Sequence, residues 1–228
     1  MNELLERLKV ISRNDGACLF AVADIDSGLR SHFHGLERNI TDRLKRAVSF
    51  AVPIPGPVLD SLTDGPTPLY FFVYRKLNAL LDDIALKISS EIIINGGQAL
   101  PIPSSHIVDW ERQLASFSHR HAAVAAGMGW LGSNNLLVTP EFGARLRLCT
   151  VLTDLDLPHG KPREDSPPCG ECTACADICP ANAIGKTAAD HNFERCFNAL
   201  KAFRKTHNVG QYICGLCQKA CVPFSEIK

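Results

Sequence analysis

Residues 169–180 read CGECTACADICP, and their four cysteines follow the spacing C-x2-C-x2-C-x3-C-P. In ferredoxin-type sequences with this spacing, three thiolates bind one iron–sulfur cluster and the fourth binds a second cluster. The stretch therefore predicts another group of cysteines farther along the chain. The first set consists of Cys169, Cys172, Cys175 and Cys179.

A second set of four cysteines is present downstream, and its last three members repeat the x2 and x3 spacings of the first set. Because the fourth cysteine of such a run binds the other cluster, the two sets exchange one ligand each. The exchange assigns Cys221 to the first cluster and Cys179 to the second. The sequence thus predicts two [4Fe–4S] clusters. The second set consists of Cys196, Cys214, Cys217 and Cys221.

Zinc sites and disulfide frameworks also use paired cysteines. Zinc ribbons use C-x2-C pairs, whereas residues 169–180 carry three cysteines in consecutive x2 steps followed by C-P. Disulfide frameworks are typical of small secreted chains, and this chain has 228 residues and begins without a signal-peptide pattern. Iron–sulfur ligation fits the spacing best. Cys18 and Cys149 lie in apolar runs and are interpreted as small buried hydrophobes.

The composition excludes some classes of protein. The 24 Lys and Arg residues balance 24 Asp and Glu residues, so the strong basic bias of a nucleic-acid-binding domain is absent. No run approaches the roughly 18 apolar residues of a membrane span, so no membrane association is expected. Ten cysteines without an export signal indicate the reducing cytoplasm. Lys201, Arg204, Lys205 and His207 form a local basic cluster, which is either a binding patch or, more simply, a solvated helix face.

The first part of the chain alternates strand and helix patterns, which is typical of an α/β fold. We expect an α/β domain over residues 1–157, binding a corrinoid or a partner, and a ferredoxin-like domain with two clusters over 158–228. The proline-rich, charged segment 156–168 is the expected linker. The predicted helices are 2–12, 40–46, 69–94 and 117–126, and the predicted strands are 18–25, 47–54, 99–103, 135–139 and 146–155, the last two joined as a hairpin.

Residues 127–132 read GMGWLG and match the pattern G-x-G-x-x-G. The dinucleotide-binding fingerprint needs a strand before this motif and a helix after it. Here the preceding HRHAAVAA looks helical and the following NLLVT looks like a strand, so NAD binding is not expected. We expect Gly127, Gly129 and Gly132 to let the backbone approach another surface closely, either a packed helix or a bound cofactor.

An ordered series of motifs precedes the two cysteine sets: His119-Arg120-His121-Ala122-Ala123, residues 127–132, Asn134-Asn135 and Thr153-Asp154-Leu155. Over about residues 70–223 this series resembles the epoxyqueuosine reductase family, and the displaced Cys196 is its most specific part. The same layout resembles the core of reductive dehalogenases. The chain looks like a short form of this family, without the C-terminal helical-repeat domain that helps the family hold tRNA.

The resemblance implies a cobalamin-binding α/β domain joined to a two-cluster ferredoxin module. In the family, electrons pass through the clusters to the corrinoid cobalt, which then reduces an epoxide on a tRNA nucleoside. A low-potential donor such as a ferredoxin or flavodoxin is the expected partner, and tRNA is not, because the helical-repeat domain is missing. The resemblance places residues 119–135 near the cobalamin. The expected cofactor-binding residues are Gly127, Gly129, Trp130, Gly132, Asn134 and Asn135.

The chain departs from the family pattern at its proton donor. Aligned on the glycines, the family's proton-donating aspartate falls at Gln113, whose amide cannot act as a carboxylic acid does. Asp109 is the nearest carboxylate, and the side chains of His119 and His121 can also donate a proton. The candidate catalytic residues are therefore Asp109, His119 and His121. The other departures are Ser133 in place of the family's lysine, and Cys221-Val222-Pro223-Phe224 in place of C-P-W-N.

Two functions stay open at this point. The first is a cobalamin-dependent reductase acting on an unknown substrate, in which the clusters pass single electrons to the cobalt. The second is an electron-transfer protein whose α/β part docks a redox or corrinoid partner and which has no substrate chemistry of its own. An RNA-binding module with purely structural clusters fits the neutral charge least well.

Overall fold

The computed structural model describes residues 1–163 and 169–226. These residues form two compact units that are interleaved along the sequence, whereas the predicted division at 157/158 follows chain order and stays a prediction. We call them the sheet unit and the cysteine unit. The sheet unit comprises Met1–Val52, Asn78–Met128 and residues 147–163, and the cysteine unit comprises Pro53–Leu77, Gly129–Leu146 and residues 169–226.

A four-stranded sheet with strand order β1-β2-β6-β3 forms the centre of the sheet unit. β1 pairs with β2, and β3 with β6, in antiparallel register. The backbone N–H of Lys45 donates to Thr153 O (2.8 Å) and that of Ile54 to Arg145 O (2.9 Å), so β2 and β6 also run antiparallel. The strands are β1 Leu19–Asp24, β2 Arg46–Pro53, β3 Ala99–Ile102 and β6 Leu146–Thr153.

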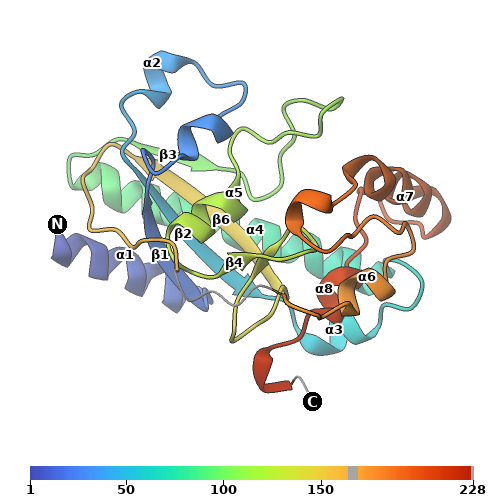
Figure 1. The fold of residues 1–228 in the computed structure, drawn as a ribbon. Helices are drawn as coiled ribbons and strands as arrows, with labels where there is room; N and C mark the ends of the chain where they lie inside the picture. Colours follow the sequence, from blue (N-terminus) through green and yellow to red (C-terminus); the bar gives the residue numbers. More distant parts are fainter. Residues whose placement is uncertain (164–168, 227–228) are drawn as a thin grey trace. The chain divides into compact units, whose positions relative to one another are not determined.

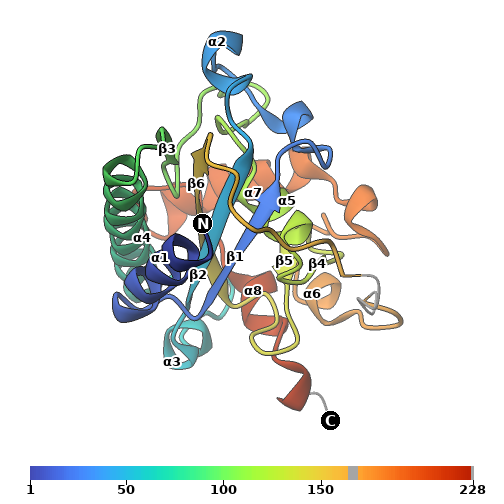
Figure 2. The ribbon, with the colours of Figure 1, turned by 90° about the vertical axis from the view of Figure 1, so that its left-hand side faces the viewer.

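Helices cover both faces of this sheet, with α1 (Asn2–Asn14) and α4 (Pro68–Ile94) on one face and α5 (His119–Ala125) on the other (Figures 1 and 2). The apolar repeat of α4 places fully buried Ile84 and Ile88 one turn apart. On the opposite face, Ala122 and Ala125 of α5 share a buried cluster with Leu152 of β6. Small alanine side chains let α5 lie close to the sheet.

The remaining elements are short, apart from one helix of 14 residues, α7. Within the described ranges, no helix is both long and apolar enough to cross a bilayer. The short elements of the sheet unit are η1 Leu29–His32 and α2 Arg38–Thr41. α7 spans Phe193–Thr206 in the cysteine unit. The short elements of the cysteine unit are α3 Gly56–Asp60, β4 Trp130–Leu131, β5 Leu137–Val138, α6 Ala174–Asp177, η2 Ala188–Asp190, α8 Leu216–Ala220 and η3 Phe224–Glu226.

Two sequence predictions are wrong, and both failures come from sheet pairing. The turn after β5 forms, with paired backbone hydrogen bonds between Thr139 and Gly143. The strands on its two sides do not form a hairpin, because β5 pairs with β4 while β2 and β3 occupy both edges of β6. The helix expected over 40–46 ends at Thr41, since the Lys45 N–H bonds to β6 and Arg46 already begins β2. The helix at 69–94 and the strands at 18–25, 47–54 and 99–103 are confirmed within one or two residues.

Replacing Ile88 with alanine tests the packing of α4. Ile88 is fully buried, so Ile88→Ala should lower the free energy of unfolding by about 2–5 kcal/mol through lost burial and the cavity left behind. Leu86 on the same helix is 58% exposed, and Leu86→Ala should change it by about 0.5 kcal/mol or less. Denaturant unfolding of both variants measures this difference, and equal effects would contradict the assigned helix face.

Candidate functional site

One apolar pocket of the cysteine unit is lined by four cysteines, Cys179, Cys196, Cys214 and Cys217. They come from the end of the first run, from α7, from the segment before α8 and from α8 itself. This is the ligand set that the crossed pairing predicts for one cluster. The rest of the wall is mostly apolar and consists of Pro180, Ala181, Ile184, His191, Ala199, Leu200, Phe203 and Leu216.

The other four cysteines lie within electrostatic reach of one another. Burial raises the pKa of Cys221 to about 11, and the thiols of Cys169, Cys175 and Cys172 contribute to the rise. Burial likewise raises the pKa of Cys175 to about 11, again with contributions from Cys169 and Cys172. The pKa of Cys217 is raised by burial, by its pocket neighbours and also by Cys175. Cys221 thus lies near the cysteines of the first run, and Cys179 lines a pocket with the second set, as the crossed pairing expects; their ligation of clusters stays a prediction.

The surroundings of these thiols disfavour thiolates unless a cation is present. Burial, followed by the nearby Cys196 and Cys179, raises the pKa of Cys214 to about 11, because desolvation and like charges both penalise the anion. Iron cations offset both costs. Among residues 1–163 and 169–226, no three His, Cys, Asp or Glu side chains converge on a single metal ion. A cubane [4Fe–4S] cluster does not need several side chains to converge on one metal ion, because each of its four thiolates binds a different iron.

A buried glutamine fixes α8, the helix that carries Cys217. The Gln218 side-chain amide donates to the carbonyl oxygens of Ala144 (3.1 Å) and Leu146 (3.0 Å). Its oxygen accepts a hydrogen bond from the Tyr70 hydroxyl (2.9 Å). Both amide protons and the oxygen are therefore used, which makes this buried carboxamide a stable anchor. The anchor ties the backbone around Cys217 to β6 and to the first turn of α4.

The glycines of residues 127–132 serve close backbone packing. Gly127 follows α5 with a φ of +80°, a conformation that favours glycine. A Cβ on Gly129 would overlap the carbonyl oxygen of Val138 in β5. A Cβ on Gly132 would lie 2.5 Å from a Val138 methyl carbon and 3.5 Å from Cys169 Sγ. The motif therefore allows β4 and β5 to pack closely beside Cys169 of the first run. Its role in binding a cofactor stays a prediction.

The three other residues expected to bind the cofactor lie in the same hairpin. Asn134 Oδ1 accepts a hydrogen bond from Leu136 N (3.2 Å), and Asn135 adopts a φ of +60°, so both shape the turn. Trp130 is buried, with its ring 5.4 Å from that of Phe224. The Trp130 indole N–H has no acceptor among the described residues. Buried donors are rarely left without a partner, so a bound molecule with an acceptor would suit this position.

Asp109 lies in a pocket of the sheet unit with a volume of about 600 Å³. The loop folds back on itself, because the backbones of Asp109 and Leu114 pair and Asp109 Oδ1 accepts from Arg112 N (2.9 Å). Gln113, at the family's acid position, directs its amide to Trp110 O within this loop. The sequence alone did not single out Trp110 or Arg112, although both adjoin Asp109. The pocket is lined by Phe33, His34, Gly35, Val108, Asp109, Trp110, Arg112 and Leu114.

His119 has protein partners for both ring nitrogens. Nε2 lies 3.0 Å from Pro103 O, and Nδ1 lies 3.0 Å from Thr150 Oγ1. A carbonyl oxygen only accepts, so Nε2 carries the proton and Nδ1 accepts from the hydroxyl. Burial lowers the pKa of His119 to about 4, so the ring is neutral at pH 7. These contacts tie α5 to the sheet, and a catalytic role stays a prediction.

His121 forms a stacked pair with His32, with ring centroids 3.9 Å apart. Its Nδ1 lies 2.6 Å from Ser118 Oγ. Burial, then the charges of His32 and Arg120, lower the pKa of His121 to about 4. The pKa of His32 is lowered as well, first by burial. The pair is therefore neutral at pH 7, and its contacts are those of a packed histidine; a catalytic role for His121 stays a prediction.

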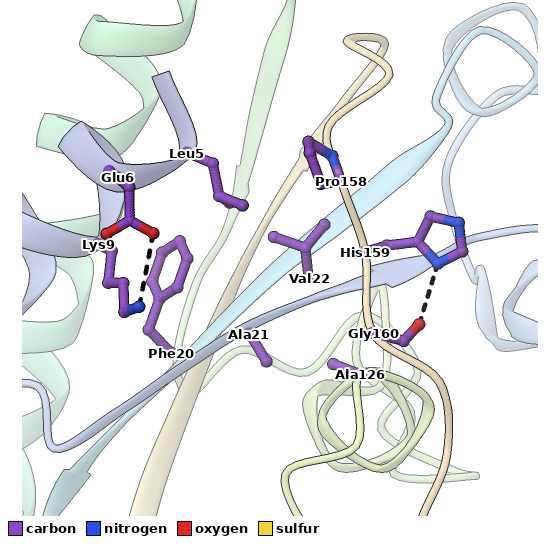
Figure 3. A pocket seen from close by; sticks show the side chains of 10 residues that line it. All are labelled: Leu5, Glu6, Lys9, Phe20, Ala21, Val22, Ala126, Pro158, His159 and Gly160. Carbon is purple, nitrogen blue, oxygen red and sulfur yellow. Dashed lines mark hydrogen bonds and ion pairs between the residues drawn. The ribbon is translucent and has the colours of Figure 1, made fainter. Parts of the chain in front are cut away.

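A further pocket of the sheet unit, about 250 Å³ in volume, opens between α1, β1 and residues 158–160 (Figure 3). Its floor is apolar, with Phe20 at one side. Glu6 and Lys9 pair with each other at 3.6 Å, and the His159 ring lies 2.9 Å from Gly160 O. None of the predicted site residues lines this pocket, so it takes no part in the proposed chemistry.

Comparison with known proteins finds similarity to reductases, although no family model matches the chain. Epoxyqueuosine reductases of Bacillus cereus and Gloeobacter violaceus are 34% and 37% identical over 112 residues. These matches cover 46% and 45% of this chain but 29% and 34% of the relatives, so the chain spans about a third of their length. A tetrachloroethene reductive dehalogenase of Desulfitobacterium hafniense is 50% identical over 64 residues, which is 27% of this chain and 12% of that protein.

Solved structures of the same two kinds of enzyme share the fold. Epoxyqueuosine reductase from Streptococcus thermophilus matches with a TM-score of 0.65 at 19% identity, over 100% of this chain and 68% of that one. A catabolic reductive dehalogenase matches with a TM-score of 0.72 at 18% identity, over 95% of this chain and 31% of that one. The chain therefore has the mixed helix-and-sheet fold seen in these reductases.

Replacing Gly129 with alanine tests the close packing of β4 and β5. The new Cβ would overlap Val138 O, so Gly129→Ala should disrupt the hairpin beside Cys169 and reduce iron incorporation by more than half. Gly56→Ala is the matched control, because a Cβ on Gly56 meets nothing within 4 Å. Iron analysis after anaerobic reconstitution compares the two variants. Full iron loading of Gly129→Ala would contradict the packing argument.

The His119 contacts predict a neutral ring over most of the pH range. Its resonances in histidine-labelled protein should stay constant from pH 8 to about 5 and titrate near pH 4, assigned with His119→Gln. Since the folded pKa lies below the ordinary value of about 6.5, the unfolded state binds more protons between these pKa values. This contribution to stability is complete above about pH 6.5 and falls, by at most roughly 1.4 kcal/mol per pH unit, as the pH drops toward 4. A midpoint near 6.5 would contradict the bonding scheme.

Proposed function

We propose that this chain is an iron–sulfur reductase of the epoxyqueuosine reductase and reductive dehalogenase type, with two [4Fe–4S] clusters and a corrinoid. The observation that carries the proposal is the four-cysteine pocket, whose members are the crossed set Cys179, Cys196, Cys214 and Cys217. Cysteines far apart in sequence line one apolar pocket in the combination that two-cluster ligation requires. The relatives, all named reductases, support the same class of activity.

The chain's own residues suit the retention of clusters. Cys169, Cys172, Cys175 and Cys221 would hold one cluster, and the four pocket cysteines the other. The Ala183 N–H donates to Cys179 Sγ (3.5 Å), and such bonds stabilise a thiolate ligand. The apolar wall of the pocket limits the access of water. When bound, the clusters supply single electrons.

A corrinoid fits one feature of the predicted cofactor segment. The buried indole N–H of Trp130 has no acceptor in the part of the chain that the structure describes, and a corrinoid carries amide oxygens around its ring. A bound corrinoid would supply a cobalt ion that receives electrons and reduces the substrate. The packing of Gly129 and Gly132 fixes the hairpin that presents Trp130.

Asp109 is the proton source that we propose for the reaction. It lines a pocket of the sheet unit, and His34, Trp110 and Arg112 lie with it. A half-buried carboxyl group beside an open pocket can deliver a proton to a bound molecule, whereas both nitrogens of His119 are held by the protein. Asp109→Asn should therefore abolish substrate turnover and leave the iron content unchanged.

The relatives suggest two classes of substrate. One relative was solved with an epoxyqueuosine-modified tRNA stem loop, and others are named for tetrachloroethene. An epoxide and an organohalide both lose an electronegative substituent on reduction, so assays with an epoxyqueuosine-containing nucleoside and with tetrachloroethene cover both classes. A ferredoxin or flavodoxin would deliver the electrons.

Anaerobic reconstitution with iron, sulfide and hydroxocobalamin tests the proposal, with metal analysis and EPR after desalting. We expect about eight irons and about one cobalt per chain. About eight irons without cobalt would contradict the corrinoid reductase and favour an electron-transfer protein that serves a separate partner. Bound zinc without a cluster signal would overturn the ligand assignment.

Single cysteine variants test the crossed sets. Cys196→Ser should lose one cluster and retain about four irons, because Cys196 belongs to only one set. Cys18→Ser is the control, since the Cys18 thiol donates to Ala51 O in the sheet unit, and it should retain all the iron. Equal iron in the two variants would contradict the assignment of Cys196 as a ligand.

A further inference from the structure

Helix α7 concentrates positive charge in a chain that is neutral overall. It carries Arg195, Lys201, Arg204 and Lys205 against a single carboxylate, Glu194. The longer α4 carries three charges of each sign. The four cations of α7 are exposed. The surface of α7 is therefore basic.

Aromatic rings hold two of these cations in place and form with them a continuous row, the α7 row. Phe193 and Phe197 stack one helical turn apart, with centroids separated by 6.1 Å, and Phe197 meets the ring of Tyr212 edge-on at 5.4 Å. Lys201 Nζ lies 4.8 Å above the Phe197 ring. Arg204 lies 5.0 Å above the Tyr212 ring and donates to its hydroxyl (2.8 Å). Such pairs fix the position of each cation.

The cations of the α7 row have no acidic partners among the described residues. The ion pairs of ranges 1–163 and 169–226 do not include Lys201, Arg204 or Lys205. His207, the fourth member of the basic cluster seen in the sequence, turns back to Asp64 (3.7 Å) and to the Phe203 ring. Within these ranges, the cations of the row are therefore available to carboxylates of a partner.

The adjacent face of α7 lines the four-cysteine pocket. Cys196, Ala199, Leu200 and Phe203 all belong to that wall, at the i, i+3, i+4, i+7 spacing of one helix face. The α7 row lies to the side of this face. A helix with its side chains is about 10–12 Å across, so a molecule seated on the row stands within roughly one helix diameter of the four thiols.

We propose that the α7 row docks the protein that donates electrons, a one-electron carrier with an acidic face. In the transfer, the reduced carrier would lose one electron and the cluster held by the pocket cysteines would gain it, with no covalent bond formed or broken between the two proteins. Aromatic residues and arginine are enriched at protein interfaces, and complementary charge speeds encounter and fixes orientation. The inference rests on the proposed function, because it needs a cluster in the pocket.

Basic and aromatic residues also suit single-stranded RNA, but these rings are already used. Bases bind by stacking on open aromatic faces. The faces of Phe197 and Tyr212 are covered by Lys201 and Arg204, and Phe193 stacks on Phe197. What the row offers to a partner is mainly fixed positive charge, which pairs with carboxylates. The geometry therefore favours an acidic protein over RNA.

Charge reversal tests the docking surface, with oxidised and photoreduced flavodoxin, an acidic one-electron carrier, as the probe. The reconstituted double variant Lys201→Glu, Arg204→Glu should bind flavodoxin about tenfold more weakly and accept its electrons correspondingly more slowly, with a reduced salt dependence. Reduction by dithionite, which needs no docking, should be unchanged. Calorimetry measures the binding, and stopped-flow absorbance measures the reduction.

The double variant Arg75→Glu, Lys76→Glu is the matched control. These two cations also lie over phenylalanine rings on an exposed helix face, and their reversal changes the net charge equally. The control should bind flavodoxin within about twofold of the unaltered protein, since its cations lie outside the row. Equal effects of the two reversals, or none, would overturn the proposal.

Two other outcomes separate the possible failures. If dithionite produces no cluster signal in the unaltered protein, the proposed function fails, and the docking surface fails with it. If clusters form but charge reversal on α7 abolishes tRNA binding, measured by fluorescence anisotropy, and leaves flavodoxin binding intact, the docking proposal alone is overturned and the row is assigned to RNA.

Discussion

The cost of holding thiolates together in a partly buried environment is the constraint on which the cysteine unit depends. Burial alone raises the pKa of several of these thiols, and each thiolate neighbour raises it further. Only a cation relieves both penalties. In the crossed ligation that we propose, Cys221 completes the set of the first run and Cys179 that of the second. The first set then spans residues 169–221 and the second residues 179–217, so each proposed cluster needs a long, folded segment of the chain.

The surrounding packing fits that demand, since backbones approach the cysteine segments where side chains would not fit. A Cβ on Gly132 would crowd Val138 next to Cys169, and a Cβ on Gly143 would overlap the carbonyl oxygen of Cys221. Both amide protons and the side-chain oxygen of Gln218 form hydrogen bonds that join α8 to its neighbours. Gly129 and Gly132 of the G-x-G-x-x-G pattern thus have a structural explanation in the packing of β4 on β5.

The sequence predicts best those features that depend on local chemistry or on period. Ligand spacing groups Cys179 with Cys196, Cys214 and Cys217, which line one pocket, and apolar periodicity defines α4 almost to the residue. The failures are non-local. Nothing between residues 40 and 46 shows that Lys45 will bond to β6, and no turn residue shows that β6 has both edges occupied. The same limit explains Trp110 and Arg112, which become site candidates only because the loop folds back at Asp109.

The basic cluster of α7 shows how tertiary contacts decide between two interpretations that the sequence leaves open. A solvated helix face and a docking patch have the same composition, and a net charge of zero says nothing about where charges gather. The deciding contacts come from outside the helix: Tyr212 fixes Arg204, while Asp64 draws His207 away. Cations held on rings lose less freedom on binding than free side chains do. A helix that lines the four-cysteine pocket with one face and carries such cations beside that face is suited to receive a charged carrier.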